Sequence, residues 1–247
     1  MKPSIDKKHD SYILYDNEFA GKVITDWFEP AYWESQQAIE GVANGRGTTW
    51  FVQQADEHWV LRHYRRGGLV SKLLEDRYLW TGLEQTRAWR EWSLLTDMQQ
   101  QALPVPKAVA ARVCKQGLFY TADLLTERIP EARSLSQCLT SRKLDALQWC
   151  QIGKVIKRFH QAGIYHADLN AHNIMLNSAD EVFLIDFDRG EQRPVDSWTE
   201  MNLQRLRRSL DKLKRSLKDF SFEEADWQDL MQGYHLQQGQ GHPAGAG

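Results

Sequence analysis

The chain has 247 residues, a formal net charge of −2 at pH 7, 42% hydrophobic residues and 26% charged residues. This composition is typical of a folded globular protein and excludes a disordered or fibrous chain. Because there is no net positive charge, we expect no nucleic-acid partner. The sequence contains no apolar run long enough for a transmembrane helix, and its first residues lack the apolar core of a signal peptide. We therefore expect a cytoplasmic location.

The first half of the chain is predicted to consist mainly of short strands. FEPAYWES (28–35) has the aromatic content of a strand or a buried turn, and GVANGRG (41–47) is typical of a turn-rich loop. TTWFVQQ (48–54) and HWVLRHY (58–64) are rich in β-branched and aromatic residues. We expect these two segments to pair as a hairpin.

A helical spacing of apolar residues begins at about residue 83 and continues to 101, where the sequence LPVP ends it. Two further strands are predicted at 108–114 and 118–125. The segment TERIP (126–130) has the character of a connector between two halves of the chain.

The second half is predicted to be mostly helical. One helix covers 144–161, with Gly163 just beyond its C-terminus. Two more helices are expected to start at capping boxes, SWTE (197–200) and SFEE (221–224). Short strands are expected around Met175 and 182–185.

These elements predict an α+β fold with two lobes and a tail. The N-terminal lobe covers residues 1–126, and the C-terminal catalytic lobe covers 127–236. The tail, 237–247, is rich in glycine and proline and is expected to be flexible.

The segment HADLNAHNIMLN (166–177), followed by IDFDRG (185–190), concentrates the residues that could carry chemistry. Its histidines match no structural zinc spacing. Asn173 and Asp186 are oxygen ligands of the kind that magnesium uses together with substrate phosphates. Asp168 could then accept a proton from a hydroxyl nucleophile. Such a set suits phosphoryl transfer, in which positioning and charge neutralisation dominate.

HADLNAHN also resembles the H-x-D-L-x-x-x-N catalytic loop of protein-kinase-like enzymes, and IDFD resembles the strand end that carries their Asp-Phe-Gly motif. This resemblance implies a strand-rich N-lobe with one helix, a small and mostly helical C-lobe, and ATP and Mg²⁺ as cofactors. It also implies that His166 is structural and hydrogen-bonds the backbone near Asp186. The chain departs from the motif at Ala167, which replaces an arginine, and at Asp188, which replaces a glycine.

The same resemblance implies a set of nucleotide contacts in the first half of the chain. Glycines ahead of a strand would let the backbone approach phosphates. A basic residue on the next strand would hold the phosphates and pair with a glutamate of the helix. The implied contacts are Gly45 and Gly47 (phosphates), Val60 (adenine), Arg62 (phosphates, in place of the usual lysine), Glu91 (partner of Arg62), and Glu127 and Ile129 (connector). Lys72 and Glu84 are the less favoured substitutes for Arg62 and Glu91.

WVLRHYRRGG (59–68), HADLNAHNIML and IDFDRG together resemble the lipopolysaccharide kinase family, and within it the kinases of 3-deoxy-D-manno-octulosonic acid (Kdo). The resemblance covers about residues 25–235. It implies ATP-dependent phosphorylation of the 4-hydroxyl of a Kdo residue on lipid A precursor, in lipopolysaccharide inner-core biosynthesis of a Gram-negative bacterium. The protein would then be peripheral at the cytoplasmic face of the inner membrane. Because this acceptor is anionic, Arg65, Arg66 and Arg189 are expected to bind it, or else to be solvated surface residues.

The helix from residue 197 carries seven basic residues, which form either a solvated face or a face attracted to anionic lipid headgroups. They are Arg205, Arg207, Arg208, Lys212, Lys214, Arg215 and Lys218. Three alternatives to a Kdo kinase stay open: another sugar or small-molecule kinase of heptose or aminoglycoside type, a membrane-associated pseudokinase scaffold, and a small atypical protein kinase. The sequence does not predict the oligomeric state.

Overall fold

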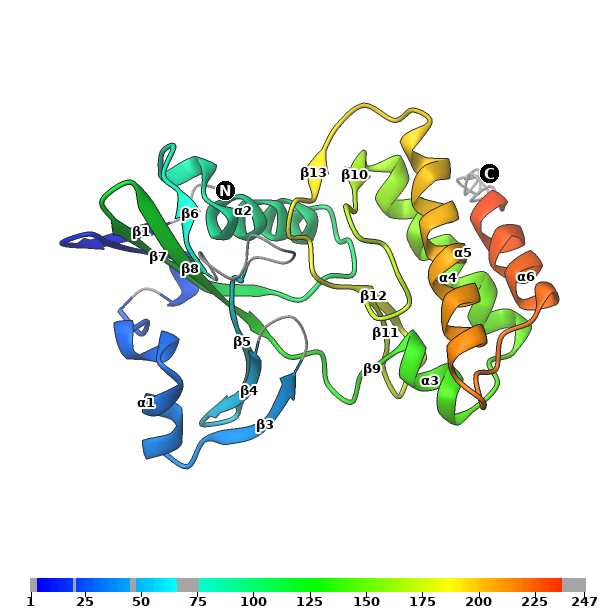
Figure 1. Cartoon of the computed structure of the whole chain (residues 1–247), viewed down its shortest axis with the longest axis horizontal. Helices are drawn as coiled ribbons and strands as arrows, with labels where there is room; N and C mark the ends of the chain where they lie inside the picture. The colour runs from blue at the N-terminus through cyan, green and yellow to red at the C-terminus, as the bar shows by residue number, and fades with distance from the viewer. Residues whose placement is uncertain (1–3, 20, 45–47, 66–75, 237–247) are drawn as a thin grey trace, which may run out of the picture. The chain divides into compact units, whose positions relative to one another are not determined.

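A computed structural model of the chain describes residues 4–19, 21–44, 48–65 and 76–236 (Figure 1). It has mixed α+β architecture and divides into two compact units. The first, called the sheet unit, comprises residues up to 132 together with 166–168 and 183–192. The second, called the helical unit, comprises 133–165, 169–182 and 193 onward. The division into lobes after residue 126 stays a prediction.

The sheet unit is built on an eight-stranded antiparallel sheet in the order β1-β2-β7-β8-β5-β4-β3, with β6 paired to β8 (Figure 1). The predicted hairpin and the two later strands are confirmed as β4–β5 and β7–β8. The strands are β1 (Ser4–Lys8), β2 (Ser11–Tyr15), β3 (Ile39–Asn44), β4 (Thr48–Gln54), β5 (Glu57–His63), β6 (Tyr78–Leu79), β7 (Ala108–Gln116) and β8 (Phe119–Glu127).

Each face of the sheet is covered by different elements. Side chains alternate between faces along a strand, so Leu61 and His63 of β5 point to one face while Val60 and Arg62 point to the other. The face that carries Leu61 packs against the 3-10 helix η2 (Thr25–Phe28) and helix α1 (Pro30–Ser35) in an aromatic core. The face that carries Arg62 meets helix α2 (Arg87–Gln100), which contacts β7 and β8.

The predicted helix near residue 83 is confirmed as α2, but it begins at Arg87 because a 3-10 helix, η4 (Leu83–Gln85), precedes it. The side chain of Thr86 accepts a hydrogen bond from the N–H of Trp89 and caps the helix. The buried face of α2 includes Ala88, Trp92 and Leu95, which recur at the i, i+4 and i+7 positions that predict one face of a helix. This face fixes which side of α2 meets the sheet.

The helical unit contains α3 (Leu135–Ser141), α4 (Ala146–Gln161), α5 (Trp198–Ser216) and α6 (Glu224–His235). The short strands of the chain's second half are β9 (Arg133–Ser134), β10 (Ile164–Tyr165), β11 (Ile174–Leu176), β12 (Val182–Leu184) and β13 (Glu191–Gln192). The predicted end of α4 is confirmed, since Gly163 follows it at φ 71°. None of the helices that the structure describes is long and apolar enough to cross a lipid bilayer.

Several local predictions for the first half are wrong. Residues 30–35 form helix α1, because Pro30 sits at the first helical position, where its missing N–H costs nothing. Residues 1–126 therefore contain a second helix where one was expected. Residues 41–44 belong to β3 rather than to a loop, and β1 and β2 were not predicted.

Both predicted capping boxes are also wrong. Helix α5 begins directly after Ser197, as predicted, but the Ser197 side chain makes no capping hydrogen bond. At α6 the box is formed by Glu223 and Asp226, two residues later than predicted. Carboxylates near a helix N-terminus suit the helix dipole, so Glu223 can take the capping place of a serine.

Helices α4 and α6 pack closely because each has a glycine at their contact. A Cβ added at Gly153 would lie 2.0 Å from the carbonyl oxygen of Leu230, and one added at Gly233 would lie 2.0 Å from that of Cys150. No side chain fits in such a gap, so the backbones themselves meet here.

We expect Gly233→Ala to lower the free energy of unfolding by about 2 kcal/mol or more, because the added methyl forces the two helices apart. Without that contact, alanine in a helix would be about 1 kcal/mol more stable than glycine. Urea unfolding measures the change. Gly41→Ala is the matched control, since its Cβ meets only Phe51 at 3.6 Å. Equal stability of the two variants would contradict the close backbone contact.

Candidate active site

Arg62 of β5 is the centre of the polar groups on the α2 face of the sheet. Its guanidinium forms ion pairs with Glu91 of α2 and with Asp186, which follows β12. The guanidinium also lies over the ring of Tyr64, 4.9 Å from its centroid. One planar, permanently charged fork thus joins a strand, a helix and the 185–190 segment.

Glu91 is only 3% exposed, and its carboxylate is held by two donors. Besides Arg62, the Tyr64 hydroxyl donates a hydrogen bond of 2.6 Å to Glu91 Oε2. Burial raises the pKa of Glu91 to about 7, although the charge of Arg62 opposes that rise. Burial also raises the pKa of Tyr64 well above its usual range, which keeps its hydroxyl protonated as a donor. Tyr64 could not be predicted as a site residue, because its role depends on α2 lying against β5.

Asp186 occupies an unusual backbone conformation, with φ at 63°. Its neighbour in the chain is fixed by His166, whose Nε2 donates to the Ile185 carbonyl at 2.9 Å. His166 Nδ1 accepts the backbone N–H of Asp168 at 3.1 Å, so the neutral Nε2–H tautomer satisfies both bonds. Burial would raise the pKa of Asp186, but the adjacent Arg62 outweighs it and lowers that pKa below its usual range.

The residue that replaces the motif's glycine has a partner of its own. Asp188 accepts a 2.7 Å hydrogen bond from Arg87 at the start of α2, and the Arg87 guanidinium lies over the ring of Tyr78. Gly190 closes the turn by donating its N–H to the Phe187 carbonyl at 2.7 Å. A Cβ at Gly190 would lie 2.9 Å from that carbonyl oxygen, so the turn needs glycine. The Arg87–Asp188 pair joins residues 101 apart and could not be predicted from spacing.

Asp168 and Asn173 lie on the loop that passes from the sheet unit to the helical unit. Asp168 is half-buried and follows His166 in the sheet unit. Asn173 is 8% exposed, and its N–H donates to the Asn170 carbonyl at 3.1 Å. His172 beside it is exposed, with Nδ1 2.8 Å from Ser136 Oγ. The catalytic role of Asp168 and the metal-binding role of Asn173 stay predictions.

The adenine contacts implied by the sequence lie on β5 and at the end of β8. Val60 is half-buried and shares the face of Arg62. Glu127 ends β8, and its carboxylate lies 3.3 Å from Lys107 Nζ. No described residue hydrogen-bonds to the main-chain N–H or C=O of Ile129. Those two groups could therefore bind a ligand through the main chain.

The structure gives no support for the roles predicted for the other residues. Glu84 is exposed in η4, whereas Glu91 reaches Arg62. Four residues lie outside the described part of the chain, and their predicted roles stay predictions: Gly45, Gly47, Arg66 and Lys72.

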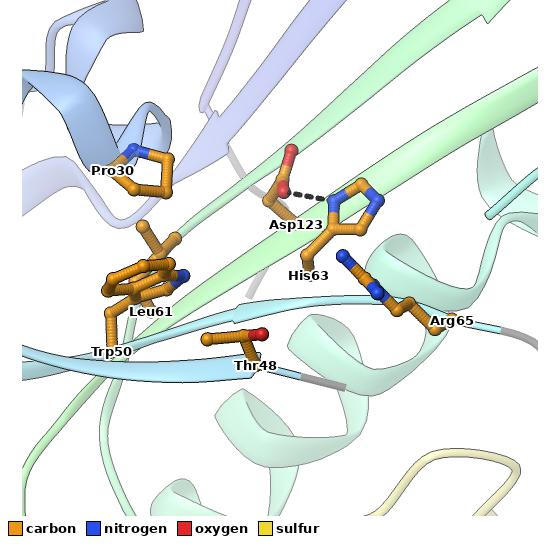
Figure 2. Close-up of a pocket in the computed structure, with 7 residues that line it drawn as sticks. All are labelled: Pro30, Thr48, Trp50, Leu61, His63, Arg65 and Asp123. Atoms are coloured by element: carbon orange, nitrogen blue, oxygen red, sulfur yellow. Dashed lines mark hydrogen bonds and ion pairs between the residues drawn. The ribbon is translucent and has the colours of Figure 1, made fainter. Parts of the chain in front are cut away.

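Arg65 lines a pocket of about 160 Å³ on the sheet face opposite to Arg62 (Figure 2). Trp50 and Leu61 form its apolar wall, and His63 and Asp123 form its polar side, joined by a 2.7 Å hydrogen bond. The sheet therefore lies between Arg65 on one face and Arg62 with its carboxylate partners on the other. Arg189 is exposed directly after Asp188, at φ 65°.

The groups predicted to hold magnesium have suitable chemistry. Magnesium binds carboxylate and amide oxygens, usually one or two from the protein. Asp186 is 40% exposed and kept ionised by Arg62, so its carboxylate can reach a ligand from solvent. Asn173 adds an amide oxygen from a position five residues after Asp168.

The raised pKa of Glu91 predicts a pH-dependent stability. Between the unfolded-state pKa of about 4.3 and the native pKa of about 7, the native protein holds a proton that the unfolded chain has released. The free energy of unfolding should therefore fall as the pH rises from 5 to 7. The lowered pKa of Asp186 acts in the opposite direction but only at lower pH.

Urea unfolding of the wild type and of Glu91→Gln at several pH values measures this effect. Because glutamine does not titrate, the stability of the wild type relative to Glu91→Gln should decrease across that range. Parallel pH curves for the two proteins would show that Glu91 keeps an ordinary pKa.

Comparisons with known proteins identify the family to which this chain belongs. A model described as the lipopolysaccharide kinase (Kdo/WaaP) family matches residues 30–234. A protein named 3-deoxy-D-manno-octulosonic acid kinase from Mannheimia succiniciproducens is 46% identical over 215 residues, 84% of this chain and 89% of the relative. Proteins of the same name are 40% identical in Vibrio vulnificus (strain YJ016), over 92% of this chain and 96% of the relative, and in Haemophilus influenzae (strain PittEE), over 93% and 98%. The chain belongs to the lipopolysaccharide kinase (Kdo/WaaP) family.

Proposed function

We propose that this chain transfers the γ-phosphate of ATP to the 4-hydroxyl of a Kdo residue on lipid A precursor, in lipopolysaccharide inner-core biosynthesis. As a member of a kinase family, the chain is a phosphotransferase. The relatives' name supports Kdo as the acceptor. The structural observation that carries the proposal is Arg62, which bridges the helix glutamate Glu91 and the loop aspartate Asp186.

Three groups would bind ATP in the sheet unit. Arg62 would hold the phosphates, because Glu91 and Tyr64 fix its guanidinium in one orientation. Val60, on the same strand face, would contact the adenine. The main-chain groups of Ile129 would pair with the adenine edge, since no described residue occupies them.

Asp186 and Asn173 would hold Mg²⁺. When bound, the ion would neutralise charge on the phosphates and help align them. The Arg62 charge keeps Asp186 ionised, and the His166–Ile185 hydrogen bond fixes the backbone beside it. These contacts would prepare Asp186 for the metal before any nucleotide arrives.

Asp168 would act as the general base. The 4-hydroxyl oxygen forms a bond to the γ-phosphorus, the bond from that phosphorus to the bridging oxygen breaks, ADP leaves, and the hydroxyl proton passes to Asp168. His166 holds the main chain of Asp168 through its Nδ1. Arg189, exposed beside Asp188, would meet the anionic acceptor at the cytoplasmic face of the inner membrane.

The direct test is to incubate the protein with ATP, Mg²⁺ and Kdo-bearing lipid A precursor and to determine the mass of the lipid product. We expect a gain of one phosphate, located on the 4-hydroxyl of Kdo by fragmentation. If the protein transfers no phosphate to this lipid but does phosphorylate a free heptose or an aminoglycoside, the proposed acceptor is wrong and the kinase activity stands.

We expect Asp168→Asn to lower kcat by about 100-fold to 10,000-fold, the range for loss of a general base. ATP binding should change little, because the amide keeps the size of the carboxylate. Single-turnover kinetics and ATP titration measure the two effects. Asp219→Asn, at an exposed position in the sequence after α5, is the matched control. Near-normal turnover of Asp168→Asn would show that another group takes the proton.

Arg62→Ala should weaken apparent ATP affinity and lower the rate, because the phosphates lose their cation and Glu91 and Asp186 lose their shared partner. Arg90→Ala removes an exposed arginine of α2 and should have no such effect. Steady-state kinetics with varied ATP compare the two variants. If Arg62→Ala leaves the dependence of rate on ATP concentration unchanged, another residue, such as Lys72, contacts the phosphates.

A further inference from the structure

One end of the sheet exposes apolar and aromatic side chains that the proposed chemistry does not use. The exposed fraction is 58% for Leu79 at the end of β6 and 74% for Leu118 in the turn between β7 and β8. Trp80 follows Leu79, and its main-chain N–H donates to the Leu118 carbonyl at 2.9 Å. Figure 1 shows β1, β6, β7 and β8 gathered at this end of the sheet.

Aromatic rings and lysines lie at the same end of the sheet, on the face opposite to the one to which Leu79 points, because Leu79 pairs with Phe119 whereas Lys115 pairs with Tyr120. Tyr12 of β2 stacks on Trp80 with ring centroids 5.9 Å apart. Lys115 Nζ lies over the Trp80 ring and Lys7 Nζ over the Tyr12 ring, each 5.3 Å from the centroid. We call this surface the hairpin-tip patch, composed of Lys7, Tyr12, Leu79, Trp80, Lys115 and Leu118.

We propose that the hairpin-tip patch docks the protein on an anionic lipid membrane. Tryptophan and tyrosine favour the headgroup level of a bilayer, where one part of the ring is apolar and another is wet. Leu79 and Leu118 would enter the acyl boundary, while Lys7 and Lys115 extend their ammonium groups toward lipid phosphates. The combination of cations around an apolar hairpin end is complementary to a membrane surface in both charge and polarity.

Three acids lie near this end of the sheet, and two of them have partners of their own. Asp6 accepts a hydrogen bond from Tyr15 at 3.1 Å, and Asp76 lies 3.4 Å from the His63 imidazole. Asp10 stands in the β1–β2 turn, where its main-chain carbonyl accepts the main-chain N–H of Lys115 at 2.8 Å, so its exposed carboxylate belongs to the same end of the sheet. Lys7 and Lys115 outnumber this carboxylate, which leaves the patch cationic on balance.

The basic face of α5 is the other candidate for lipid contact. There Arg207 pairs with Asp211 and Glu224, and Lys214 pairs with Glu223, so part of its charge is neutralised within the helical unit. Both surfaces expose apolar side chains, since Met201 of α5 is 62% and Leu217 at its end 39% exposed. The hairpin-tip patch differs in adding the stacked rings of Tyr12 and Trp80, which favour the headgroup level of a bilayer. Lipid binding by the patch is independent of the proposed function. Only the statement that this membrane contains the acceptor rests on the proposed function.

Vesicle sedimentation of the full chain tests the proposal. Vesicles of phosphatidylethanolamine with phosphatidylglycerol should bind the wild type, and vesicles of phosphatidylcholine alone should bind it less. The double variant Leu79→Ser, Leu118→Ser should lower the partition coefficient at least about tenfold. Lys7→Gln and Lys115→Gln should each lower it up to about fivefold on the anionic vesicles only.

The matched control is Leu147→Ser on α4, which alters a leucine that is 80% exposed and far from the patch in sequence. It should bind vesicles as the wild type does, and thermal unfolding should show that all variants fold. Wild-type binding by the double leucine variant would overturn the proposal. Loss of binding only in the triple variant Arg208→Gln, Lys212→Gln, Arg215→Gln on α5 would also overturn it. The same holds if the wild type self-associates without vesicles and the leucine changes abolish that self-association.

An activity readout separates this proposal from the proposed function. With acceptor embedded in vesicles, the double leucine variant should phosphorylate at least about tenfold more slowly than the wild type, matching its loss of binding. With a deacylated, water-soluble Kdo acceptor, the two should have equal rates. Normal vesicle binding without any transfer to Kdo would overturn the proposed function and leave the docking surface intact.

Discussion

The double ion pair of Arg62 is the interaction on which the sheet unit's polar face depends. A buried carboxylate such as Glu91 is costly unless it is paired and hydrogen-bonded. Arg62 and Tyr64 supply those bonds, and the second arm of the same guanidinium holds Asp186. One side chain therefore ties the position of α2 against the sheet to the position of the 185–190 segment.

Two departures from the protein-kinase pattern are explained by local partners. A lysine ammonium is a point charge, whereas the planar fork of Arg62 can bind two carboxylates in fixed directions. Asp188, which replaces a glycine, has Arg87 as its cation, and Arg87 in turn rests on Tyr78. Because each unusual residue has a compensating contact, these substitutions do not favour a pseudokinase.

Sequence patterns predicted the parts of this protein that depend on short-range order. The β-branched and aromatic content of 48–54 and 58–64 predicted β4 and β5, β7 and β8 were predicted as two further strands, and apolar spacing predicted α2 and α4. Residues 30–35 were missed because aromatic content resembles a strand, whereas Pro30 and the packing of Trp33 favour a helix. Tyr64 and Arg87 could not be predicted at all, since each acts on a residue brought near only by the fold. The capping box of α6 shows the same limit at short range, because the S-x-x-E pattern at 221–224 predicts a start two residues before the box that Glu223 and Asp226 form.

The strand β8 connects the hairpin-tip patch to Arg62, the proposed phosphate-binding residue. Leu124 of β8 pairs with Arg62, and Phe119 begins the strand at the patch. Five residues at about 3.3 Å each place these points roughly 17 Å apart along the strand. A membrane held at the patch would then leave Arg62 clear of the headgroups if β8 rises from the surface. The chemistry would suit a sugar that projects from its lipid, as Kdo on lipid A does, better than a hydroxyl in the plane of the bilayer.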